Sequence, residues 1–248
     1  MVNTETGIKI SDALTGYRKG KRDHKLVRIE DLEFKAGELV TIAGANGAGK
    51  STLIRSICGL LPLLEGHIFI NKKDVALMSP AELATQIAVV LTHKVGGFNL
   101  KVKDAVAAGQ MPYTNAFHRL ENVHNEAVKQ AMILCNIKDV ADTLLDELSD
   151  GMFQKTMIAR ALAQQTRILL LDEPSAFLDY SSKHQLFVLL KELAHNQGKC
   201  VLISSHELDL ALKYSDRMLL MGAGTVQLLD PDAAREDQLF KEMSGGFL

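Results

Sequence analysis

The sequence has no long hydrophobic run and no secretion signal, and these absences narrow where the protein can work. Its longest apolar stretch, residues 57–64, is interrupted by Gly59 and Pro62 and is far shorter than the ~20 residues that a membrane-spanning helix needs. The first residues, such as Asn3 and Glu5, lack the basic start and apolar segment of a signal peptide. We therefore expect a cytoplasmic protein that reaches a membrane only through a partner.

Cysteine is scarce, and charge is nearly balanced. Cys58, Cys135 and Cys200 lie far apart with no CxxC spacing, and the eight histidines form no HxxxH pair. This pattern gives no sign of a metal cage and predicts three buried, hydrophobic cysteine side chains. The formal net charge of −2 gives no reason to expect a nucleic acid partner.

The N-terminal pattern indicates a β-hairpin. Residues 8–14 alternate apolar and polar side chains as a half-buried strand does, and a second strand is expected over residues 26–34. Between them, residues 18–25 are basic and polar and are predicted to form a solvated loop. We expect these strands to form an antiparallel β subdomain.

The rest of the chain indicates an α/β core with a helical insertion. Strand patterns alternate with helix patterns, which implies a mainly parallel sheet covered on both faces. From about residue 98 to 165 the pattern is helical, so we expect a helical subdomain inserted into a single domain that spans residues 1–248. The clearest core elements are the predicted strands 39–43, 168–171 and 200–204 and the predicted helices 51–58, 181–196 and 207–214.

Residues 44–51 read GANGAGKS and match the phosphate-binding pattern GxxxxGK[ST] at every position, between a predicted strand and a predicted helix. Glycines let the backbone N–H groups point at phosphate oxygens, and the helix dipole adds positive potential. Lys50 can reach the β- and γ-phosphates, and the Ser51 hydroxyl can bind Mg²⁺. The predicted phosphate-binding residues are Gly44, Asn46, Gly47, Ala48, Gly49, Lys50, Ser51 and Thr52.

A second motif lies about 120 residues later. Residues 168–171 form an apolar strand that ends in Asp172 and Glu173. Strand ends of a parallel sheet open onto the ligand crevice, so Asp172 can hold Mg²⁺ and Glu173 can deprotonate the attacking water. Together the motifs predict a P-loop NTPase core that binds ATP and Mg²⁺.

These motifs and the helical region between them resemble the nucleotide-binding domain of ABC transporters over nearly the whole chain. Residues 148–152, LSDGM, stand where that family carries its LSGGQ signature. The resemblance implies that Ser149 and the Gly151 backbone bind the γ-phosphate of ATP held by a second copy, in an ATP-sandwich homodimer. It also implies ATPase activity.

Three further positions match the family. Residues 175–179, SAFLD, are similar to the D-loop, whose aspartate, here Asp179, helps couple the two sites of the dimer. His206 follows a predicted strand as the family's catalytic switch histidine does. Tyr17 lies near the position where the family places an aromatic ring against adenine.

Two positions depart from the family pattern. Asp150 and Met152 replace glycine and glutamine of the signature, and a carboxylate beside a triphosphate should repel it. Thr92 stands where the family has a glutamine that contacts Mg²⁺, and we expect it to be a weaker substitute. The neighbouring His93 is a candidate partner contact.

Residues 102–113 are similar to ATPases of iron–siderophore, haem and cobalamin importers, with Gln110 in place of an arginine. The resemblance implies that this chain lies on the inner face of the membrane, bound to integral membrane permease subunits, and that a substrate-binding protein acts outside the membrane. Two alternatives stay open: an ABC-type ATPase of translation or DNA repair, and a weakly hydrolysing nucleotide-dependent regulator. The presence of Glu173 and His206 disfavours the regulator.

Overall fold

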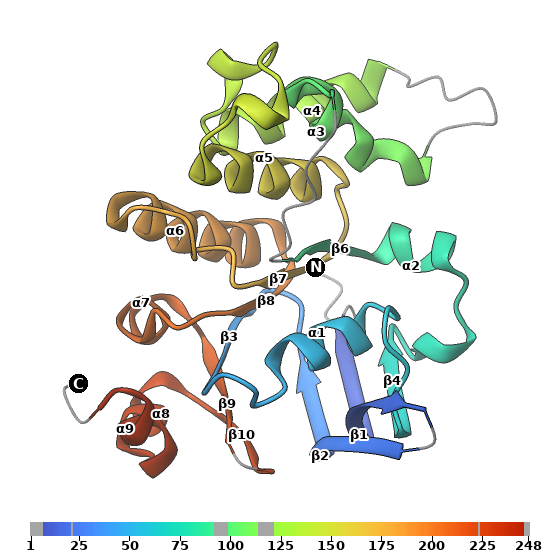
Figure 1. Ribbon diagram of the computed structural model, residues 1–248, viewed down its shortest axis with the longest axis vertical. Coiled ribbons are helices and arrows are strands. Elements are labelled where there is room, and N and C mark those ends of the chain that lie inside the picture. Colours follow the sequence, from blue (N-terminus) through green and yellow to red (C-terminus); the bar gives the residue numbers. More distant parts are fainter. Residues whose placement is uncertain (1–6, 21, 92–98, 114–121, 223, 246–248) are drawn as a thin grey trace.

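The computed structural model describes residues 7–20, 22–91, 99–113, 122–222 and 224–245, and it contains two β-sheets and a group of helices at one end (Figure 1). The larger sheet has the strand order β10-β9-β3-β8-β7-β6. All its neighbouring strands pair in parallel except β10 with β9, so the prediction of a mainly parallel sheet is confirmed. Its strands are β3 (Leu39–Gly44), β6 (Ile87–Val90), β7 (Ile168–Asp172), β8 (Cys200–Ser204), β9 (Arg217–Met221) and β10 (Val226–Leu229).

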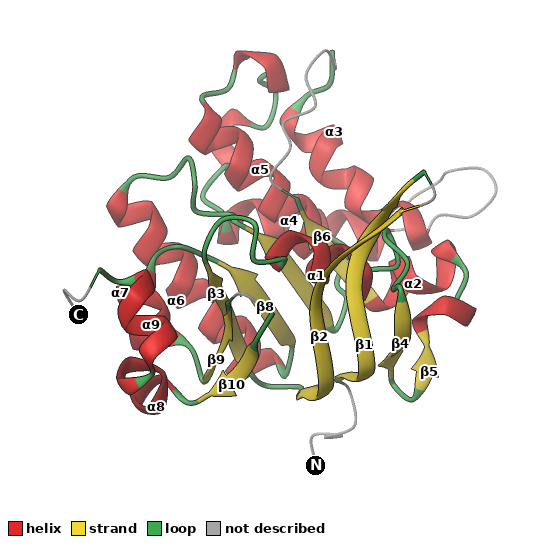
Figure 2. Ribbon diagram, turned by 60° about the horizontal axis from the view of Figure 1, so that its bottom comes forward, coloured by secondary structure: helices red, strands yellow, loops and turns green. Residues whose placement is uncertain are grey.

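The smaller sheet is antiparallel, as predicted, and lies beside the larger one (Figure 2). Its hairpin is longer than the sequence suggested, and the predicted loop over residues 18–25 is wrong. Arg18 pairs with Asp23 across the two strands, and their side chains form an ion pair of 3.1 Å. Such cross-strand pairs stabilise a ladder even where its side chains are polar. The strands, in spatial order, are β2 (Arg22–Phe34), β1 (Ile8–Lys19), β4 (Glu65–Ile70) and β5 (Lys73–Asp74).

Helix α1 (Lys50–Ile57) lies between the two sheets, and α6 (Tyr180–Gln197) covers the opposite face of the larger one. Leu53 of α1 packs in one core with residues of both sheets. Along β7 the side chains alternate: Leu170 joins the α1 core, and Leu171 joins the core that contains Phe187 of α6. The parallel strands are therefore apolar on both faces.

Three helices lie at one end of the molecule: α3 (Val102–Ala107), α4 (Asn122–Leu134) and α5 (Asp150–Ala163), of which α5 contacts β6 (Figure 1). Short 3₁₀ turns join them at Ala108–Tyr113, Lys138–Val140 and Leu145–Glu147. Gln110, which stands in place of the family's arginine, is buried and donates a hydrogen bond to the carbonyl of Ala163. Just beyond α5, the amide of Gln164 donates to the carbonyls of Ala84 (2.6 Å) and Ile87 (2.9 Å).

The remaining elements lie at the margins of the two sheets. A 3₁₀ turn, Val75–Leu77, precedes α2 (Pro80–Gln86), which begins at a capping box: Ser79 and Glu82 exchange side-chain and backbone hydrogen bonds. After α7 (Leu208–Tyr214) come two short helices that the sequence patterns did not predict, α8 (Pro231–Glu236) and α9 (Gln238–Met243). Their Ala234 and Phe240 pack with β9.

Two of the three cysteines are buried as predicted. Burial raises the pKa of the Cys135 and Cys200 thiols to about 12, which makes them unreactive. Cys58 is only partly buried, which corrects the prediction for that residue. No helix among the described residues is long and apolar enough to cross a bilayer.

The buried ring of Phe187 anchors α6 to the sheet, so we expect Phe187→Ala to lower the free energy of unfolding by about 3–5 kcal/mol. The measurement is urea unfolding followed by circular dichroism. Phe177→Ala is the matched control, because Phe177 is 50% exposed and Phe187 is 0% exposed. The control should lose about 0.5 kcal/mol or less, and equal losses in both variants would contradict this packing.

Candidate functional site

The glycine-rich loop connects the end of β3 to the start of α1, as the sequence predicted. Gly44 pairs with Met221 of β9, and a Cβ at Gly44 would lie 2.5 Å from the carbonyl oxygen of Met221. Gly47 and Gly49 have φ angles of 82° and 100°, which side chains other than glycine rarely adopt. These constraints keep the loop close to the sheet edge, in a conformation that can turn backbone N–H groups toward an anion.

Lys50 is buried, and its ammonium is held inside the loop. It donates to the carbonyls of Gly44 (2.8 Å) and Ala45 (3.3 Å), and it lies 3.8 Å from Oε1 of Glu173. Burial lowers the pKa of Lys50, and the carboxylates of Glu173 and Asp172 oppose that shift. A phosphate oxygen at this position would favour the charged ammonium further.

Asp172 ends β7, and its Oδ1 accepts hydrogen bonds from the hydroxyls of Ser51 (2.9 Å) and Ser204 (2.8 Å). The loop and the β7 acids are therefore in contact. A hydroxyl and a carboxylate side by side supply hard oxygen ligands, which suit Mg²⁺ when phosphate oxygens complete its coordination.

Glu173 follows with a φ of 48°, a left-handed conformation that is uncommon for glutamate. Its backbone N–H donates to the Ser204 hydroxyl at 2.9 Å. Its Oε1 lies 3.0 Å from Nε2 of His206, which follows β8. The structure thus brings together Lys50, Glu173 and His206. Strain of this kind is kept where the surroundings enforce it and is frequent at functional sites.

Ser204 bridges the two acids, and the sequence analysis did not single it out. The signal was its place at the end of a buried strand; what could not be foreseen was that Ser204 pairs with Asp172 across β7 and β8.

A cavity of about 350 Å³ opens over the loop. Tyr17 and Leu26 of the hairpin line one part of it, and Glu173 lines another. From the glycine loop and the start of α1 come Asn46, Gly47, Gly49, Lys50, Ser51 and Thr52. The hairpin contributions place an aromatic ring and an apolar side chain beside a phosphate-binding loop.

The other predicted site residues do not line this cavity. Ser149 caps α5 by accepting a hydrogen bond from the Met152 N–H (3.3 Å), and Asp179 caps α6 by accepting from Ser182. The backbone and hydroxyl bonds from Ser182 lower the pKa of Asp179. A Cβ at Gly151 would lie 3.2 Å from the carbonyl of Phe177, so the two segments are neighbours in one chain.

The predicted roles of Thr92 and His93 fall outside the described residues. The contact of Thr92 with Mg²⁺, at the position of the family's glutamine, therefore stays a prediction.

A phosphate-binding loop after β3 of a parallel sheet, with two acids at the end of β7 on the other side of β8, defines a P-loop nucleotide-binding domain. The family model described as "ABC transporter" matches residues 28–176. The petrobactin import ATP-binding protein FpuC of Bacillus anthracis is 35% identical, covering 86% of this chain and 77% of that protein. The ferric enterobactin transport ATP-binding protein FepC of Escherichia coli is 33% identical over 79% and 72% of the two chains.

A solved structure with a similar fold points to the same family as the sequence relatives. The dimeric structure of a bacterial ABC transporter cassette has a TM-score of 0.81 to this chain at 25% identity, covering 90% of this chain and 98% of that one. The chain belongs to the ABC transporter family, as one of its ATP-binding, ATP-hydrolysing domains.

Because Ser204 holds both acids, we expect Ser204→Ala to lower ATP turnover roughly ten-fold, the effect of losing about 1.5 kcal/mol of hydrogen bonding to a charged group. ATP binding should persist, since the loop is unchanged. Turnover and nucleotide affinity are measured on the same preparation. Ser215→Ala removes another buried serine, which bonds Thr41 at 2.7 Å away from the acids, and serves as control. Equal turnover in the two variants would refute the bridging role.

Proposed function

We propose that this chain is the ATP-hydrolysing subunit of an importer for a metal chelate such as an iron–siderophore, haem or cobalamin. It would work on the cytoplasmic face of the membrane with integral permease subunits and a substrate-binding protein outside. Two observations support the importer class: relatives are named for petrobactin import and ferric enterobactin transport, and residues 102–113 resemble such ATPases. The observation that carries the ATPase role is the contact of Lys50 and Ser51 with the acids of β7.

In this proposal the loop binds the triphosphate, and Lys50 exchanges its carbonyl partners for β- and γ-phosphate oxygens. Ser51 and Asp172 would hold Mg²⁺, with Thr92 as a weaker further contact. When bound, the ion neutralises charge on the phosphate oxygens. The proton transfer and the orientation of the attacking water are carried out by side chains next to the ion.

Glu173 is the general base. Its carboxylate takes a proton from the attacking water as the water oxygen bonds to the γ-phosphorus. The bond from that phosphorus to the bridging oxygen breaks, and ADP and phosphate are the products. His206, 3.0 Å from Oε1, orients the carboxylate and is placed to contact the γ-phosphate. Tyr17 stacks on the adenine.

Ser149, Gly151 and Asp179 act across a dimer of two copies. They do not line the cavity of their own chain, and they lie together where α5 begins beside the segment before α6. The N-terminus of α5, with Ser149 as its cap, presents N–H groups and a positive dipole end to an anion. That anion would be the γ-phosphate held by the second copy.

We expect Glu173→Gln to retain ATP binding and to slow hydrolysis by ~10²- to 10⁴-fold, because the general base is lost. Bound ATP then persists between the two copies, so the variant should be a dimer in ATP and a monomer without nucleotide. Light scattering after size exclusion measures both states. A monomer in both conditions would contradict the shared site, and hydrolysis near the unmodified rate would contradict the role of Glu173.

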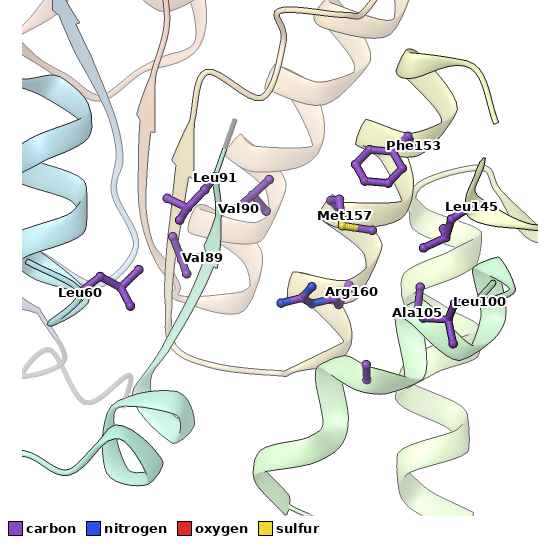
Figure 3. Close-up of a pocket in the computed structure, with 11 residues that line it drawn as sticks. Leu60, Val89, Val90, Leu91, Leu100, Ala105, Leu145, Phe153, Met157 and Arg160 are labelled. Atoms are coloured by element: carbon purple, nitrogen blue, oxygen red, sulfur yellow. The ribbon is translucent and has the colours of Figure 1, made fainter. Parts of the chain in front are cut away.

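An apolar groove of about 660 Å³ is the proposed docking surface for the permease (Figure 3). One wall is β6 with Val89 and Val90, and the other is α5 with Phe153 and Met157. Figure 3 shows Arg160 reaching from α5 into the space that faces β6. Among the described residues, apolar walls with the cation of Arg160 fit a short helical segment of the permease, whose C-terminal carbonyls or a carboxylate would meet the arginine.

Leu60→Glu tests this surface, because Leu60 lines the groove and is 60% exposed. We expect the variant to lose co-purification with the permease from membranes, while the isolated chain keeps its ATPase rate. Leu77→Glu is the matched control, since Leu77 is 78% exposed and outside the groove. Identification of the co-purified chains by mass spectrometry also tests the importer class. Retention of the permease by Leu60→Glu would refute the docking surface.

A further inference from the structure

We propose that His24 is a positioning residue for the nucleobase: its imidazole backs the ring of Tyr17, and the two rings form a stacking platform beside the phosphate loop. The inference rests on the nucleotide site proposed above and extends it to a residue that no family motif marks. The ligand class is a purine nucleoside di- or triphosphate. The tip of the hairpin then has a binding role instead of being a solvated turn.

The platform begins with an irregularity in the hairpin. The β1–β2 register shifts between Thr15 and Gly16, just before Tyr17. A Cβ at Gly16 would lie 2.3 Å from the carbonyl of His24 and 2.6 Å from a methyl of Leu64. Only glycine lets the strands approach here, and a bulge of this kind re-aims the side chains that follow it.

Beyond the bulge, Tyr17 and His24 are direct cross-strand partners. Their rings are stacked, with centroids 4.9 Å apart and planes 11° from parallel. One face of the tyrosine ring is therefore covered by the imidazole. Tyr17 lines the cavity above the glycine loop and His24 does not. In this proposal the uncovered face of the tyrosine is the one that meets the base.

Neighbouring contacts fix this part of the hairpin. The ion pair of Arg18 with Asp23 closes the next cross-strand position at 3.1 Å. Leu26, the residue of β2 left without a cross-strand partner by the register shift, also lines the cavity. A Cβ at Gly49 would lie 3.7 Å from Cβ of Leu26, so β2 passes directly over the phosphate loop.

The physical role of His24 is to limit the freedom of an exposed ring. Tyr17 is half-exposed at a hairpin tip, and an isolated tyrosine there would lose side-chain entropy when a base stacks on it. A second ring behind it already restricts the tyrosine before binding. Less side-chain entropy is then lost when a base stacks, which raises the affinity. A base, Tyr17 and His24 then form a three-layer stack.

The test compares the affinities of ATP and inorganic tripolyphosphate for the isolated full-length chain by calorimetry. We expect His24→Ala to weaken ATP binding about two- to ten-fold, the range for one aromatic pair, and to leave tripolyphosphate binding unchanged. His24→Phe keeps a ring and should restore ATP affinity. His67→Ala is the matched control, because His67 stacks on Phe69 in the same sheet outside the cavity.

Fluorescence gives a second readout. The chain has no tryptophan, so Tyr17→Trp places a single indole in the platform. ATP should quench its emission, tripolyphosphate should not, and adding His24→Ala should raise the ATP concentration needed.

Equal ATP affinity in His24→Ala and the unmodified chain would overturn the proposal. So would equal losses for ATP and tripolyphosphate, because the defect would then lie in the phosphate loop. The permease takes no part in these measurements, so failure of the importer function would leave them unchanged.

Discussion

The buried ammonium of Lys50 meets the carboxylates of a strand that comes much later in the chain, and the positions of both depend on the parallel pairing of β3, β8 and β7. Burying this cation without partners would be costly, and the loop carbonyls with the nearby acids offset that cost. The same contacts leave Lys50 and Glu173 close together. Polar groups held by a folded framework in this way reorganise less during a reaction than the same groups in water.

The motifs around this contact could be predicted from the sequence because each is local. The glycine spacing of residues 44–51 by itself indicates a phosphate-binding loop. An apolar strand that ends in Asp172 and Glu173 predicts where acids meet a ligand crevice. Element positions followed from periodicity, so β8 was predicted with its observed bounds. Ser204 was missed as a bridge because register between strands is a tertiary property.

Other errors have similar physical causes. The basic residues 18–25 were expected to form a loop, yet Arg18 pairs with Asp23 across the ladder, and Tyr17 stacks on His24. Helices α8 and α9 have six residues each, too short for a periodic pattern to appear. Their aspartate caps at positions 230 and 237 were the available signal. The burial of Gln110 could not be foreseen, since amides are usually exposed.

The two hydrogen bonds of Gln164 hold one end of α5, and the other end carries Ser149. They tie the C-terminal end of the helix to α2 and β6, just before the segment that leads to β7. The helix has 14 residues and is roughly 21 Å long. A rotation of about 10° around the fixed end would carry Ser149 through roughly 4 Å, by the geometry of a rod of that length. A small displacement at the groove is thus amplified at the end of the helix that would approach the phosphate of the second copy.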